Sequence, residues 1–224
     1  ELGIHIIQGY GLTECAPIVA VNRDVYFKND AAGLPLPEME VKIDSPNEEG
    51  VGEIVVKGPN VMLGYYEKPE ATAQVLKDGW FYTGDLGYID SDGFVHITGR
   101  RKNVIVTRNG KNIYPEEIET LLNRIPYVKE SMVFGLQNEN GDDVTVAAQI
   151  VPDYENIQED FPNVELSKEE IYNLIYKEVK NLNNQLVSYK RIKDIQLRDQ
   201  EFVKTTTRKI KRYIEEEKIK KSMK

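Results

Sequence analysis

The sequence changes character near residue 100, and no other feature limits the possible folds as strongly. Before this point, short β-type runs lie between glycines, as in GEIVVKG at 52–58 and GFVHITG at 93–99. After it, apolar residues recur at helical spacing between strand-like segments. We therefore expect an α+β chain: a β-rich first part, then a small α+β domain with a short, mostly antiparallel sheet and flanking helices.

The second part contains two clear helix starts. Tyr114-Pro115-Glu116-Glu117 begins one helix, because proline fits a first turn and acidic residues favour its positive end. Ser167 and Glu170 have the spacing of a capping box that begins another. By contrast, the stretch 152–166 is acidic and contains prolines, which predicts a surface loop. The expected strands cover 131–136, 144–151 and 192–197.

The composition excludes several classes of protein. Hydrophobic residues make up 40% of the chain, the mean hydropathy is −0.49, and no apolar run approaches the ~20 residues of a membrane-spanning helix. The one cysteine, Cys15, cannot form an internal disulfide, and with only His5 and His96 it cannot build a Cys/His zinc site. We expect a cytoplasmic protein.

Charge is unevenly distributed along the chain. The formal net charge is −8, but residues 202–224 carry nine Lys or Arg against three Glu. Nucleic-acid-binding proteins usually have a whole basic face, so an acidic chain with one basic tail argues against a nucleic-acid partner. The tail also lacks the large apolar face of a membrane-surface helix, so we expect at most peripheral membrane contact.

Four short segments have the residue types of a nucleotide site. In QGYGLTE (8–14), two glycines let the backbone approach a flat ligand, and a hydroxyl and a carboxylate suit a phosphate and Mg²⁺. In YTGD (82–85), the carboxylate could accept two ribose hydroxyls. GRRKN (99–103) offers an arginine fork, and KTTTRKIKR (204–212) interleaves hydroxyls with cations, which suits a polyanion. Taken singly, each is also compatible with a plain turn or a solvated charged stretch.

In order and spacing, these segments and GEIVVKGPNVMLGYY (52–66) resemble the acyl-adenylate-forming superfamily of acyl-CoA synthetases, peptide-synthetase adenylation domains and firefly-type luciferases. The resemblance covers essentially the whole chain but only the C-terminal portion of the family's length, without the family's Ser/Thr/Gly-rich phosphate loop. It implies a domain fragment whose partner is the missing N-terminal part of the same enzyme. Residues 1–99 would end the large domain, 100–103 would be the hinge, and 104–224 would be the small mobile C-terminal domain.

The resemblance also implies the chemistry. Family members are ATP-dependent ligases that activate a carboxylic acid as acyl-AMP and transfer it to coenzyme A, using ATP and Mg²⁺. The spacing of the hinge segment and the long stretch 152–166 favour a long-chain fatty acid as substrate. We expect the fragment alone to be inactive without the phosphate loop. Two alternatives stay open: an adenylation domain that loads a carrier protein, and, for the isolated chain, a nucleotide-binding module without turnover.

Five site residues in the first part follow from the motif match. Tyr10 would stack on adenine, with Gly11 beside it in the nucleotide site. Thr13 would bond a phosphate oxygen and Glu14 would hold Mg²⁺, so both are expected to be catalytic. Asp85 would accept hydrogen bonds from the ribose hydroxyls.

Five more site residues extend into the second part. Arg100 would assist at the ribose, and Ile97 would pack nearby. Lys102 matches the hinge position, about which the small domain would rotate between the two half-reactions. Gly110 would leave room for the pantetheine arm of coenzyme A. Lys209 would bridge the substrate carboxylate and the α-phosphate, and is the expected catalytic lysine.

Two positions are notable beside these motifs. Arg208 stands where most family members have glycine, which leaves Lys209 aligned but affects the geometry around it. Cys15 follows Glu14 and has no evident basic partner, so we expect it to fill space and not to act as a nucleophile.

Overall fold

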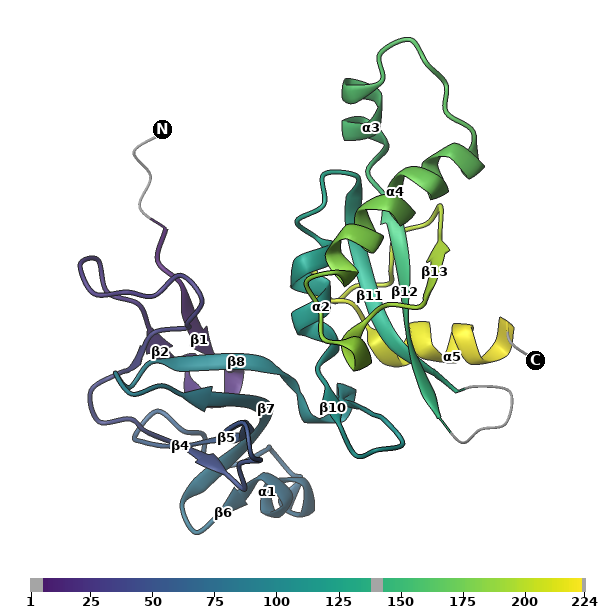
Figure 1. Ribbon diagram of the computed structural model, residues 1–224. Helices are drawn as coiled ribbons and strands as arrows, with labels where there is room; N and C mark the ends of the chain where they lie inside the picture. Colours follow the sequence, from purple (N-terminus) through teal and green to yellow (C-terminus); the bar gives the residue numbers. More distant parts are fainter. Residues whose placement is uncertain (1–5, 138–142, 223–224) are drawn as a thin grey trace. The chain divides into compact units, whose positions relative to one another are not determined.

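The chain forms two compact units that divide between Lys102 and Asn103. The structure is a computed structural model and describes residues 6–137 and 143–222 (Figure 1). We call residues 1–102 unit 1 and residues 103–224 unit 2.

Unit 1 is β-rich, as its glycine-bounded runs predict. Its described elements, in chain order, are β1 (Gly9–Gly11), the 3₁₀ turn η1 (Thr13–Cys15), β2 (Ile18–Val21), β3 (Leu34–Pro35), β4 (Glu40–Asp44), β5 (Gly52–Lys57), α1 (Pro69–Val75), β6 (Leu76–Lys77), β7 (Trp80–Ile89) and β8 (Val95–Arg100). One antiparallel sheet has the order β1-β2-β3. The other has the order β4-β5-β7-β6, with β8 also paired to β7 (Figure 1).

The core of unit 1 joins its two sheets. All residues of β5 except Lys57 are buried, and Ile54 and Val56 pack in one cluster with Phe81 of β7 and Tyr10 of β1. The aromatic residue of the QGYGLTE motif is therefore part of the core, which fixes this motif relative to β7.

Unit 2 alternates helix and strand. Its described elements are β9 (Ile105–Val106), β10 (Asn112–Ile113), α2 (Pro115–Leu122), β11 (Val128–Gln137), β12 (Val144–Pro152), α3 (Tyr154–Asp160), α4 (Lys168–Asn183), the 3₁₀ turn η3 (Ser188–Lys190), β13 (Asp194–Leu197) and α5 (Arg212–Ser222), while the 3₁₀ turn η2 (Arg101–Asn103) spans the division between the units. β12 pairs antiparallel with β11 and parallel with β13. The expectation of an α+β chain with a short, mostly antiparallel sheet is confirmed.

Unit 2 has a two-stranded antiparallel sheet, β9-β10, and a three-stranded sheet, β11-β12-β13, with an apolar layer on each face. On one face, Val133 and Ile150 belong to a cluster with the buried sides of α2 and α4. On the other, Met132 and Phe134 cluster with Ile219 of α5. Successive residues of a strand point to opposite faces, so the alternation along β11 builds both layers.

The prediction of a surface loop over 152–166 is wrong in its first half, where α3 lies. Asp153 caps this helix by accepting a hydrogen bond from the backbone N–H of Asn156. Only Ile157 of the helix is buried. One apolar position gives no periodic stripe, so the helix signal is hidden in an acidic segment.

The capping box at the start of α4 is present and gives a first prediction. Glu170 N–H donates to Ser167 Oγ at 3.3 Å, and Ser167 N–H donates to the Glu170 carboxylate at 2.8 Å. Ser167→Ala is expected to lower the free energy of unfolding by about 1 kcal/mol, because an N-terminal N–H of the helix loses its partner. Urea denaturation of the 224-residue chain measures this, with Ser167→Asp as the control that keeps an acceptor. Equal stability of the alanine and aspartate variants would contradict the prediction.

None of the helices within 6–137 and 143–222 combines the length and apolar character needed to cross a membrane.

Candidate functional site

The Thr-Gly-Asp motif lies in a bulge of β7, where the pairing with β5 shifts register. Gly84 has a φ of 73°, in the left-handed region that glycine adopts without steric cost. Thr83 Oγ donates to the carbonyl of Ile54 at 2.7 Å and accepts from Asp85 N–H at 3.0 Å. Bulges re-aim side chains at the edge of a regular ladder. This one fixes the backbone at Asp85.

Asp85 joins two other predicted site residues. The Tyr10 hydroxyl donates to Asp85 Oδ2 at 2.7 Å, and Arg100 Nε lies 2.6 Å from Asp85 Oδ1. The register of β7 and β8 places Arg100 directly opposite Asp85, which explains how residues 15 positions apart meet. Asp85 is 5% exposed, and a buried carboxylate requires such partners.

Tyr10 and Gly11 also have structural roles. Tyr10 is 7% exposed, and burial, followed by the charge of Asp85, raises the pKa of its phenol well above the ordinary value. The hydroxyl therefore stays protonated and donates to Asp85. At Gly11, a Cβ would lie 2.1 Å from the carbonyl oxygen of Pro17, so the chain's own backbone requires glycine there. Stacking of Tyr10 on adenine, and nucleotide contact at Gly11, stay predictions.

Glu53 supports this cluster and had no role in the sequence prediction. Its Oε1 accepts from Gly84 N–H at 3.0 Å, and its Oε2 accepts from Arg101 at 2.6 Å. Glu53 is 7% exposed. One sequence signal could have identified Glu53: it is a charged residue inside the apolar run GEIVVKG. A carboxylate buried with such a strand is almost always paired, which predicts a partner for it.

Glu14, the expected Mg²⁺ ligand, follows the exposed Thr13 in η1. Its Oε1 accepts from the Tyr65 hydroxyl at 2.9 Å, a contact that the sequence did not predict. Within the described part of the chain, no three His, Cys, Asp or Glu side chains gather in a way suited to a metal. A lone carboxylate still fits Mg²⁺, which usually binds one or two carboxylates together with water and substrate phosphates.

Cys15 is fully buried. Burial, and then the charge of Glu14, raise the pKa of its thiol to about 11. The thiol is therefore protonated near neutral pH, which agrees with a packing role.

Ile97 lies on β8 with 43% of its surface exposed, whereas its neighbours His96 and Thr98 are buried. It occupies the strand that carries Arg100, three residues away. An exposed apolar side chain at this place suits packing against a ligand, which stays a prediction for Ile97.

Gly110 lies in unit 2, in the turn between β9 and β10. Its φ is 73°, and a Cβ there would meet no atom of the chain within 4 Å. The backbone conformation thus explains the glycine, and the room for a pantetheine arm stays a prediction.

Lys209 belongs to a tight hairpin, residues 203–211, which we call the lysine hairpin. Lys204 and Ile210 form an isolated antiparallel bridge. Thr205 N–H donates to the Lys209 carbonyl at 2.8 Å, and Thr205 Oγ accepts from Lys209 N–H at 3.1 Å. Lys209 is exposed. The threonine hydroxyls, expected to suit a polyanion, are used in part to fix the backbone of the lysine.

The lysine hairpin is anchored at its base by Glu215, which is 1% exposed. The Glu215 carboxylate accepts hydrogen bonds from Arg198 at 2.8 Å, from Val203 N–H at 3.0 Å and from Lys218 at 2.9 Å. Burial alone would raise the pKa of Glu215, but these hydrogen bonds outweigh it and bring the pKa down to about 2.

Glu215→Gln is expected to destabilise the chain in a pH-dependent way. The folded-state pKa of Glu215 lies below the unfolded value of 4.5, so its charge stabilises the fold above pH 4.5 and this contribution is lost as pH falls toward 2. Urea denaturation at pH 7 should show a loss of about 3 kcal/mol in the variant, and the difference from wild type should shrink between pH 4.5 and pH 2. Glu217→Gln, at an exposed position of α5, is the control. A difference that is constant with pH would contradict this account.

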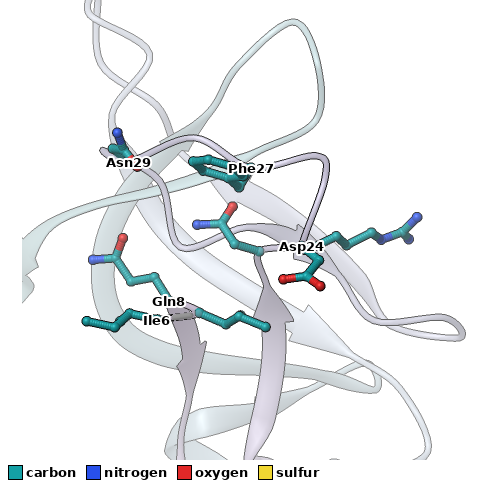
Figure 2. A pocket seen from close by; sticks show the side chains of 8 residues that line it. Ile6, Gln8, Asp24, Phe27 and Asn29 are labelled. Carbon is teal, nitrogen blue, oxygen red and sulfur yellow. The ribbon is translucent and has the colours of Figure 1, made fainter. Parts of the chain in front are cut away.

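Unit 1 also contains a cavity of about 450 Å³. Figure 2 shows Ile6 and Gln8 together with Asp24 and Phe27 around it, and Ile7, Asn22, Arg23 and Asn29 complete the lining. None of the site residues expected from the sequence lines this cavity.

Two family matches cover most of the chain. Residues 1–66 match the AMP-binding enzyme family, and residues 102–223 match the AMP-binding enzyme C-terminal domain.

The curated relatives are named as CoA ligases or synthases for different acids. The long-chain-fatty-acid–CoA ligase of Salmonella typhimurium is 44% identical over 140 residues, which is 60% of this chain and 25% of the relative. The 2-succinylbenzoate–CoA ligase of Geobacillus kaustophilus is 44% identical over 66% of this chain and 31% of the relative. The feruloyl-CoA synthase of Amycolatopsis sp is 42% identical over 71% and 34%. The chain thus spans about a quarter to a third of the length of these relatives.

Solved structures give the same grouping. ATP-bound MatB from Rhodopseudomonas palustris has a TM-score of 0.78 and 30% identity, over 99% of this chain and 42% of that chain. The o-succinylbenzoate coenzyme A synthetase of Bacillus subtilis, in complex with ATP and magnesium ion, has a TM-score of 0.74 and 30% identity, over 92% and 40%. With residues 1–66 matched to the AMP-binding enzyme family and residues 102–223 to the C-terminal domain of such enzymes, the chain belongs to the AMP-binding enzyme family.

Proposed function

We propose that the chain is the C-terminal portion of an enzyme that converts a carboxylic acid and ATP to acyl-AMP, then transfers the acyl group to coenzyme A. The observation that carries the proposal is the Tyr10–Asp85–Arg100 cluster, in which a buried carboxylate is held by a phenol and a guanidinium. A ribose bound at Asp85 would share this carboxylate with both partners. Solved relatives in complex with ATP or with an acyl-adenylate support a nucleotide as the ligand.

ATP, Mg²⁺ and coenzyme A are the proposed small-molecule partners. Glu14 would hold Mg²⁺ together with water and phosphate oxygens, and the exposed Thr13 hydroxyl would donate to a phosphate. Bound Mg²⁺ would neutralise phosphate charge. Lys209 would donate to the substrate carboxylate and the α-phosphate, stabilising the charge that both share as the new bond forms. The relative solved with ATP and magnesium supports ATP and Mg²⁺ as ligands, and the roles of Glu14, Thr13 and Lys209 are part of the proposal.

We propose residues 100–103 as the hinge between the end of the large domain and the mobile C-terminal domain. Arg101 is held in unit 1 by Glu53 at 2.6 Å, and Asn103 is held in unit 2 by the Glu116 carboxylate. Between them, Lys102 is exposed and its side chain makes no hydrogen bond or ion pair with any residue that the structure describes. A backbone rotation at Lys102 would therefore break no hydrogen bond or ion pair of the Lys102 side chain, which suits a hinge residue that absorbs a change in backbone angles.

A long-chain fatty acid is the proposed substrate. The similarity to a long-chain-fatty-acid–CoA ligase supports this substrate. The 2-succinylbenzoate–CoA ligase has the same identity of 44% to this chain. The proposal of a long-chain fatty acid over other acids therefore rests on the spacing of the hinge segment. Relatives named as CoA ligases favour coenzyme A over a carrier protein as acceptor. For the isolated chain, which lacks the phosphate loop, we propose nucleotide binding without turnover. A cytoplasmic location without nucleic-acid partners stays a prediction.

The test is AMP release by the longer enzyme over a panel of fatty acids, with and without coenzyme A, with the 224-residue chain measured in parallel. AMP that appears only with coenzyme A and is greatest for long chains supports both the reaction and the substrate. Pyrophosphate release without coenzyme A-dependent AMP release would indicate a carrier protein as acceptor. Neither product from any acid would contradict the proposed function.

A further inference from the structure

The lysine hairpin carries a second cation that the proposed function does not use. Arg208 directly precedes Lys209 and has a φ of 61°. It is the one cation among the described non-glycine residues with φ in the left-handed region, the others being Ala16, Glu38, Ser45, Glu67, Asp78 and Asn163. Glycine adopts this backbone conformation without strain, whereas arginine adopts it at a cost in free energy. The conformation alone therefore does not explain why an arginine stands here.

The cations in and beside the hairpin differ in their partners. Lys204 pairs with Glu130 at 2.6 Å and with Glu201 at 3.0 Å, and Arg212, the first residue of α5, pairs with Glu119. These pairs hold the base of the hairpin to the rest of unit 2.

At the tip, Arg208 and Lys209 are both exposed. Neither side chain makes an ion pair or hydrogen bond with any residue in 6–137 or 143–222. A hydrogen bond closes the turn beneath them, since Arg208 N–H donates to the Thr205 carbonyl at 2.9 Å. Two adjacent unpaired cations on a hydrogen-bonded turn are suited to an anion with more than one charged group.

We propose that Arg208 binds the β- and γ-phosphates of ATP and stabilises pyrophosphate as it leaves, while Lys209 acts at the α-phosphate. This inference rests on the proposed function. In adenylation, a carboxylate oxygen bonds to the α-phosphorus, and the bond to the bridging oxygen breaks with its electron pair going to pyrophosphate. The charge that develops there lies next to the group that Lys209 contacts. The planar guanidinium fork of Arg208 matches two phosphate oxygens, which a lysine does not.

The test uses three variants of Arg208 in the longer enzyme. Arg208→Asn and Arg208→Gly both remove the charge and both tolerate a positive φ, so they separate charge from backbone strain. Arg208→Lys keeps the charge with the native strain. ATP–pyrophosphate exchange gives KM for pyrophosphate, equilibrium dialysis of labelled inorganic pyrophosphate gives its affinity without turnover, and supplied acyl-adenylate gives KM for coenzyme A.

We expect both neutral variants to raise KM for pyrophosphate about tenfold and to weaken its binding equally, with KM for coenzyme A unchanged. Arg208→Lys should have a KM for pyrophosphate between the values of the neutral variants and that of the wild type. Unchanged pyrophosphate binding in the neutral variants, or a shift in KM for coenzyme A instead, would overturn the inference. The wild-type enzyme and Lys209→Ala, measured alongside, distinguish the failures. If the wild type shows no exchange with any acid, the proposed function itself is wrong. If Lys209→Ala leaves exchange intact, the role of Lys209 at the α-phosphate is wrong.

Discussion

Lys209→Ala is expected to lower the rate of acyl-adenylate formation by about a hundredfold or more, and to leave thioester formation from supplied acyl-adenylate near the wild-type rate. The lysine is exposed at the tip of the lysine hairpin, and its backbone is held by Thr205. Its ammonium would stabilise charge shared between the carboxylate and the α-phosphate. That charge exists only in the first half-reaction, so only this step should suffer.

The measurement is ATP–pyrophosphate exchange for the first step and coenzyme A-dependent AMP release from acyl-adenylate for the second, both in the longer enzyme. Lys220→Ala is the matched control, because Lys220 is also exposed but lies on α5, outside the hairpin. Lys220→Ala should leave both steps unchanged. Equal loss of both steps in Lys209→Ala would contradict the assigned role.

Lys102→Pro is expected to uncouple the two half-reactions and to reduce overall turnover by at least about tenfold. Proline fixes φ, removes the backbone N–H and restricts the preceding residue, so a rotation that changes φ at residue 102 would be blocked. When the two half-reactions are assayed separately, their rates should fall by different factors, because the fixed conformation suits one of them better than the other.

Lys102→Ala separates the backbone from the side chain. The Lys102 side chain is exposed and makes no ion pair or hydrogen bond with the residues described, so alanine should retain nearly full turnover. Wild-type turnover in Lys102→Pro would place the hinge elsewhere. A loss in the alanine variant as large as in the proline variant would show that the side chain matters and not the rotation.

Much of the fold is predictable because its signals are local. The start of α4 follows from a serine and a glutamate three residues apart, and its buried side follows from apolar residues at helical spacing. Helix α3 was missed because Ile157 is its one buried residue. Its stability comes from packing and from the Asp153 cap, neither of which forms a periodic pattern.

Three of the predicted site residues, Tyr10, Asp85 and Arg100, lie together in the structure, but their contacts could not be predicted. Asp85 and Arg100 lie in recognisable motifs, yet their pairing depends on the register of β7 and β8. Glu53 and Tyr65 were missed because their hydrogen bonds to Gly84 and Glu14 span 31 and 51 residues of sequence. Such contacts are decided when strands and turns pack, and no short motif encodes them.

The bulge in β7 has a consequence for the thermodynamics of ligand binding. β7 is hydrogen-bonded to three other strands, and the bulge around Gly84 is held by Thr83 and by Glu53. The Asp85 carboxylate therefore loses its conformational freedom when unit 1 folds, before any ligand arrives. A ligand that binds there meets a preorganised acceptor. Its binding free energy therefore includes no entropy cost for ordering the Asp85 side chain.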